Sequence, residues 1–136
     1  MRFLIFCLAL LSLLVVPLSA AAQPDPLPYA AKGQYTVGVA RLREASDPSR
    51  VLEGFIWYPA QPNTGQGMMQ YGLGKRSQAA VESAAPERGG APYPLIVFSH
   101  GYGSVAAQST FLVEHLAAHG FVVISINHPG STFGDT

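Results

Sequence analysis

Two polar segments each follow a short apolar run in the last third of the sequence, and their residue types suit chemistry at an oxygen that gains negative charge. The first, Ser99–Ser104, contains a His-Gly-x-Gly pattern made by His100, Gly101 and Gly103, and the second is Asn127–Thr132. Glycines let a backbone turn sharply with its amides exposed. Backbone N–H groups aimed at one oxygen stabilise the oxyanion of a tetrahedral acyl-transfer intermediate. The first segment is therefore a candidate oxyanion-binding loop.

The elements around these segments form a strand, helix, strand pattern. Pro94–Phe98 is a continuous apolar run, typical of a parallel strand buried on both faces. A helix is predicted over about Val105–His119, with Gly120 capping its end, and Phe121–Ile126 is a second apolar strand. Such a βαβ unit pairs its strands in parallel, and ligand sites collect at the carboxyl ends of parallel strands. The two polar segments are therefore expected to be neighbours around one cleft.

The predicted helix has one apolar face. Leu112, Leu116 and His119 share that face, and we expect it to pack on the sheet. Ser104, ahead of the helix, is expected to be its cap rather than a nucleophile.

A hairpin is predicted upstream of the βαβ unit. Gln34–Arg43 alternates apolar and polar residues, Asp47–Ser49 carries turn residues, and Val51–Tyr58 is rich in β-forming residues. The short connection favours antiparallel pairing.

The stretch between the hairpin and the βαβ unit is expected to be irregular. From about residue 61 to 92, Gly, Pro, Gln, Ser and Ala dominate, which predicts a long flexible loop. Ser77–Ala85 is expected to form at most a turn or two of helix.

The first residues indicate export. Residues 1–22 contain Arg2, an apolar run and a small-residue end, which is typical of a secretory signal peptide, and a Pro-rich leader covers 23–33. The alternative is an uncleaved membrane anchor. The protein is accordingly predicted to be periplasmic or extracellular, with no stable membrane span once the signal is removed. The only cysteine, Cys7, lies within the signal, so no disulfide framework is expected.

The charges argue against two classes of partner. Eight basic residues balance eight acidic ones, so the chain lacks the basic field of a nucleic-acid-binding protein. No residue cluster has the spacing of a zinc or calcium site.

The same segments carry a family resemblance. Tyr93–Gly103, Phe111–Val123 and Asn127–Thr132 resemble the platelet-activating-factor acetylhydrolase and dienelactone-hydrolase-like branch of the α/β-hydrolases, as do Tyr35–Gly38 and Ile56–Pro59 upstream. The resemblance implies the N-terminal part of an α/β-hydrolase fold over residues 34–136. It also implies a serine esterase that acts on an ester or lipid-like small molecule and needs no metal or cofactor.

The resemblance assigns roles to single residues. In this fold the loop after the third strand supplies one oxyanion amide, which here would be the backbone N–H of Tyr102. His100, Gly101 and Gly103 would support that loop, and His100 is expected to hold it rather than transfer protons. For His128, lining the substrate and a structural role remain open. Ser131 is expected to make polar loop contacts and is a possible lining residue.

The sequence departs from the family at the decisive point. The family places its nucleophile in a G-x-S-x-G elbow, followed by an acid and a histidine, and this sequence has no such elbow. The chain is therefore expected to be an incomplete hydrolase domain that lacks the catalytic triad. The alternative interpretations are a non-catalytic exported binding module and a non-functional remnant.

Overall fold

The computed structural model describes residues 27 and 29–135. The signal peptide predicted for residues 1–22 lies outside the described residues, as do residues 23–26 and 28 of the Pro-rich leader. In the part of the chain that the structure describes, no helix has the length and hydropathy needed to cross a bilayer.

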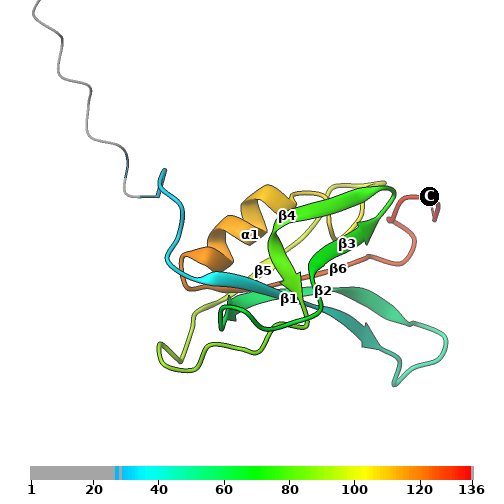
Figure 1. Cartoon of the computed structure of the whole chain (residues 1–136). Helices are drawn as coiled ribbons and strands as arrows, with labels where there is room; N and C mark the ends of the chain where they lie inside the picture. Colours follow the sequence, from blue (N-terminus) through cyan, green and yellow to red (C-terminus); the bar gives the residue numbers. More distant parts are fainter. Residues whose placement is uncertain (1–26, 28, 136) are drawn as a thin grey trace, which may run out of the picture.

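The described residues form one mixed six-stranded sheet with one helix against it (Figure 1). The elements are β1 (Thr36–Glu44), β2 (Leu52–Ala60), β3 (Met68–Gly72), β4 (Lys75–Glu82), β5 (Leu95–Phe98), α1 (Thr110–Ala118) and β6 (Val122–Ile126). The strands lie side by side in the order β3-β4-β1-β2-β6-β5.

The two predicted units are present. β1 and β2 form an antiparallel hairpin in which Val39 is opposite Trp57, and Ser49 closes the turn by donating its backbone N–H to the Asp47 carboxylate. β5 and β6 pair in parallel on either side of α1 in the sequence, and β6 joins the hairpin through antiparallel pairing with β2. The predicted fold class is therefore confirmed.

The prediction of one long loop over residues 61–92 is wrong in its middle. Residues 68–82 form the β3–β4 hairpin, and β4 adds to the sheet by pairing in parallel with β1. The helical turns expected over Ser77–Ala85 are absent, since most of that segment is strand. The β3–β4 pairing contains register shifts, so its buried residues do not alternate as in a regular strand.

The core lies between the sheet and α1. Side chains from β1, β2 and β6 meet the helix there, led by Val39, Trp57 and Val123, which are fully buried. The helix begins at Thr110, five residues later than predicted, and ends before Gly120, whose φ of +94° suits a glycine cap. Ser109 occupies the N-cap position, so the expectation of Ser104 as helix cap is wrong.

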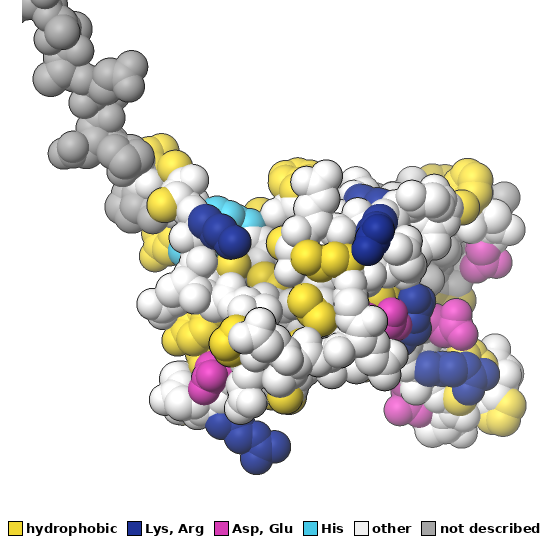
Figure 2. All heavy atoms as spheres, in the orientation of Figure 1, with side chains coloured by type: hydrophobic (Ala, Val, Ile, Leu, Met, Phe, Trp, Pro, Cys, Tyr) yellow, Lys and Arg dark blue, Asp and Glu magenta, His cyan; other side chains and the backbone are white. Residues whose placement is uncertain are grey.

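Two expectations about burial are wrong, the first only in part. The helix buries Val113 and Ala117 against the sheet. Of the predicted face, Leu116 is partly buried against the core, but Leu112 is 39% exposed. β5 is covered on one face only: Ile96 and Phe98 pack against the core, whereas Leu95 and Val97 are 64% and 74% exposed. In Figure 2, apolar side chains likewise appear among the polar ones on the face that is in view.

Candidate active site

The segments after β5 and β6 lie side by side, as the strand pattern predicted. Gly103 donates its N–H to the carbonyl oxygen of Ser131 at 2.9 Å, and Ser104 and Thr132 form an isolated parallel bridge. Phe133 returns a 2.8 Å bond from its N–H to the carbonyl of Ser104. These bonds extend the parallel β5–β6 pairing beyond the ends of the two strands. They hold the glycine loop in a fixed place at the carboxyl edge of the sheet.

The glycine loop is also braced from within. Gly101 donates its N–H to the Gln108 side-chain oxygen at 2.9 Å, and Ser104 donates to the Gly101 carbonyl at 3.0 Å. Gly103 has a φ of +68°, a left-handed conformation that glycine adopts without the cost a Cβ brings. The sequence therefore folds here into a tight turn.

The Tyr102 amide is the free backbone donor of this turn. Among the described residues, the Tyr102 N–H has no hydrogen-bond acceptor, whereas the N–H groups on either side of it, those of Gly101 and Gly103, are both bonded. The Tyr102 side chain is 81% exposed. An unpaired amide at the carboxyl end of a parallel strand is available to a ligand oxygen.

Two histidines join the loops. His100 is buried, with its ring centroid 4.5 Å from that of His128. Its Nδ1 lies 2.8 Å from the Gly101 carbonyl oxygen, and its Nε2 accepts a 3.3 Å bond from the His128 backbone N–H. Both ring nitrogens of His100 therefore have partners within the loops.

The structure adds a serine that the sequence interpretation missed. Ser99 Oγ lies 2.9 Å from His128 Nε2, and Ser99 is exposed. A signal for this pair was present, since Ser99 directly follows β5 and His128 follows β6 by two residues. The other predicted lining residue, Ser131, is half-buried and faces Gly103 through its carbonyl.

Asn127, which follows β6, holds the segment that leads into α1. The Asn127 side-chain oxygen accepts a 2.7 Å bond from the Ala106 N–H. This bond ties the end of β6 to the segment between the glycine loop and α1. The described residues contain no group of three or more His, Cys, Asp or Glu side chains placed to hold a metal ion.

Comparison with known proteins connects this arrangement to a family. The family described as "Platelet-activating factor acetylhydrolase, isoform II" matches residues 55–132, which include both polar loops. The platelet-activating factor acetylhydrolase of Canis lupus familiaris is 48% identical over 44 residues, which cover 32% of this chain and 10% of that protein. That of Gallus gallus is 34% identical over 64 residues, covering 47% and 15%.

A solved structure shares the architecture. A ferulic acid esterase from Streptomyces cinnamoneus superimposes with a TM-score of 0.62 at 28% sequence identity, over 76% of this chain and 37% of the esterase. The mixed sheet and helix are thus those of an α/β-hydrolase esterase. The sequence match to the canine acetylhydrolase spans only about a tenth of the length of that protein.

Proposed function

The chain belongs to the platelet-activating factor acetylhydrolase isoform II family, and from that membership we propose that it is the N-terminal portion of an exported serine carboxylic-ester hydrolase. Its contribution is the first half of the oxyanion hole. The nucleophile, acid and base come from sequence beyond this chain, because the chain has no G-x-S-x-G elbow.

One observation carries the proposal: among the described residues the N–H of Tyr102 has no acceptor, whereas the N–H groups of Gly101, Gly103 and Ser104 are all bonded. A donor that is already in place stabilises the oxyanion without reorganising during the reaction. The bonds of Gly103 to Ser131 and of Gly101 to Gln108 keep that donor in place. These contacts support the Tyr102 amide as the oxyanion donor, with Gly101 and Gly103 as its conformational support.

The histidines take supporting roles in this proposal. His100 braces the loop, since its two ring nitrogens are already engaged. His128 and Ser131 lie beside the loop and line the approach to it. The substrate is an ester or lipid-like small molecule, which agrees with relatives named as an acetylhydrolase and a ferulic acid esterase.

The proposal that the protein is exported rests on the sequence of residues 1–22. If they are a cleaved signal, the protein recovered from the periplasm or the medium begins at Gln23. N-terminal sequencing of that material gives the start directly, and a start at Met1 or Arg2 would instead indicate a retained anchor.

The first test of the enzyme proposal is to read the gene beyond the Thr136 codon. The proposal expects a reading frame that continues into a G-x-S-x-G segment with a later acid and histidine. A stop codon with no such segment downstream would contradict the hydrolase proposal and favour a binding module or a non-functional remnant.

The second test uses the complete hydrolase. Tyr102→Pro removes the amide hydrogen and is expected to lower kcat by on the order of 10²–10³-fold, the usual effect of losing one oxyanion donor. Tyr102→Ala keeps the amide and is the matched control, expected to retain kcat within about threefold. Equal kcat losses in the two variants, at unchanged urea midpoints, would contradict the assignment.

A further inference from the structure

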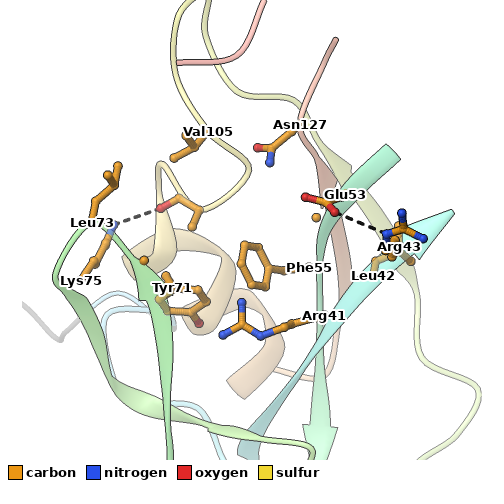
Figure 3. A pocket seen from close by; sticks show the side chains of 13 residues that line it. Arg41, Leu42, Arg43, Glu53, Phe55, Tyr71, Leu73, Lys75, Val105 and Asn127 are labelled. Atoms are coloured by element: carbon orange, nitrogen blue, oxygen red, sulfur yellow. Dashed lines mark hydrogen bonds and ion pairs between the residues drawn. The ribbon is translucent and has the colours of Figure 1, made fainter. Parts of the chain in front are cut away.

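A pocket of about 440 Å³ opens beside the glycine loop (Figure 3). Its walls come from the carboxyl end of β1, the start of β2, the β3–β4 turn and the segment at Val105 and Ala107. This volume lies within the range of small-molecule sites. Asn127 also lines it, but Tyr102 and His128 do not, so the pocket lies next to the oxyanion loop without including its donor, and the inference goes beyond the proposed function.

The interior of the pocket is aromatic. Phe55 and Tyr71 meet edge to face, with their ring centroids 5.2 Å apart. The Tyr71 hydroxyl is already used, because it donates to Glu114 and accepts from Trp57. The Tyr71 ring therefore offers the pocket an apolar surface.

The rim of the pocket is basic. Arg41, Arg43 and Lys75 line it together with a single acidic residue, Glu53. Figure 3 shows Lys75 and Arg43 on opposite sides of the hollow, with Phe55 between them. An apolar interior with cations at its rim matches a molecule that has an apolar body and a negative head.

Of the three cations at the rim, Lys75 is the one without a carboxylate partner among the described residues. Arg41 pairs with Glu82 at 3.1 Å, and Arg43 pairs with Glu53 at 3.5 Å. Lys75 Nζ contacts only the carbonyl oxygens of Ala107 and Gln108, at 3.1 and 3.3 Å, and among the described residues it has no carboxylate partner. Carbonyl dipoles orient the ammonium group without neutralising it.

We propose that this pocket binds an amphipathic carboxylate, with its apolar body against Phe55 and Tyr71 and its carboxylate facing Lys75. One unpaired cation selects a single negative charge on the ligand. Burial of the body against two aromatic rings supplies most of the affinity, and the ammonium group supplies the preference for an anion.

The test is a fluorescence titration of the 136-residue chain. Trp57 is the only tryptophan, and its ring centroid lies 5.7 Å from that of Phe55 and 6.1 Å from that of Tyr71, so it reports on the pocket. The probes are decanoate, decyltrimethylammonium and acetate, all below micelle-forming concentrations. Decanoate is expected to give a saturable change at least tenfold tighter than either of the others. Equal affinity for the anionic and cationic decyl probes would overturn the proposal.

Substitutions at and beside the pocket test whether decanoate binds there. Lys75→Met is expected to weaken decanoate binding by about tenfold, which corresponds to one hydrogen bond to a charged group. Arg76→Met removes the same charge one residue along, outside the pocket lining, and is expected to leave binding unchanged. Equal effects of the two changes would show a general charge effect and overturn the proposal.

A filling variant covers the case in which Lys75→Met does not fold. Val105→Phe places bulk in the pocket without adding a second tryptophan and is expected to abolish saturable decanoate binding. Undiminished binding by a folded Val105→Phe chain would overturn the assignment to this pocket, whatever the result at Lys75.

Discussion

The Tyr71 hydroxyl donates a 2.7 Å hydrogen bond to the Glu114 carboxylate and thereby joins the β3–β4 hairpin to the helix. The Trp57 indole donates a 2.7 Å bond to the same hydroxyl, and Ser77 Oγ adds a 2.9 Å bond to the same carboxylate oxygen. Glu114 is 8% exposed. A buried carboxylate needs such donors, so this network fixes where the hairpin sits on the core.

Tyr71→Phe is expected to lower the free energy of unfolding by about 1–3 kcal/mol, because Glu114 loses a donor and the Trp57 indole loses its acceptor. Urea unfolding followed by Trp57 fluorescence measures the change. Tyr102→Phe removes the same hydroxyl from an exposed side chain and is expected to change stability by less than about 0.5 kcal/mol. Similar losses in both variants would argue against the network.

The same tyrosine predicts sensitivity to alkali. Burial, aided by the bond to Glu114, raises the pKa of Tyr71 above its ordinary value of 10.0. The folded state therefore resists deprotonation more than the unfolded state, so the stabilisation is complete below about pH 10 and is lost as the pH rises further. Urea midpoints should fall above about pH 10, and less steeply in Tyr71→Phe. Burial also raises the pKa of Tyr58, so a smaller slope should remain in that variant.

The hydrogen bond from the Ala106 N–H to the Asn127 side chain is expected to stabilise the segment between the glycine loop and α1. Asn127→Ala leaves a buried amide without an acceptor and should cost about 1–3 kcal/mol of stability. Faster amide exchange at Ala106 would locate the effect. Asn127→Asp keeps an acceptor oxygen and should exchange more slowly there than Asn127→Ala; identical rates in the two variants would contradict the role given to this side chain.

The outer face of β5 is expected to drive self-association. An edge strand with exposed apolar side chains is a template for pairing with another chain. Val97→Lys should therefore shift the chain toward the monomer in sedimentation experiments. Phe111→Lys makes the same kind of change on the helix, where the side chain is 79% exposed, and should shift the equilibrium less. An equal shift would point to apolar exposure in general.

Much of the fold could be predicted because its signals are local. The alternation before Arg43 and the apolar runs at 94–98 and 121–126 correspond to strands, and the glycine loops mark their ends. The β3–β4 hairpin was missed because its buried residues are a serine, an alanine and a methionine: Ser77, Ala80 and Met69. Their burial depends on pairing with β1 and on the bond of Ser77 to Glu114, which no local pattern reveals.

The site was predictable only in part. Strand ends placed the two loops together, and the glycine pattern pointed to Tyr102. The pocket was not predictable, since Tyr71 and Lys75 belong to the hairpin that was missed and Phe55 was indistinguishable from any other strand aromatic. The helix face was mispredicted because Phe111, Leu112 and Val113 are all apolar, so the sequence marks no single side.

The strand order has a consequence for the chain as it leaves the ribosome. β2 lies between β1 and β6, yet β6 ends at Ile126, just over half the length of the chain after β2 begins at Leu52. Synthesis therefore releases the β1–β2 and β3–β4 hairpins, whose contacts are close in sequence, long before β6 can close the other side of β2. Throughout that interval β2 carries an open edge. A nascent chain kept unfolded until translation ends would avoid that exposure.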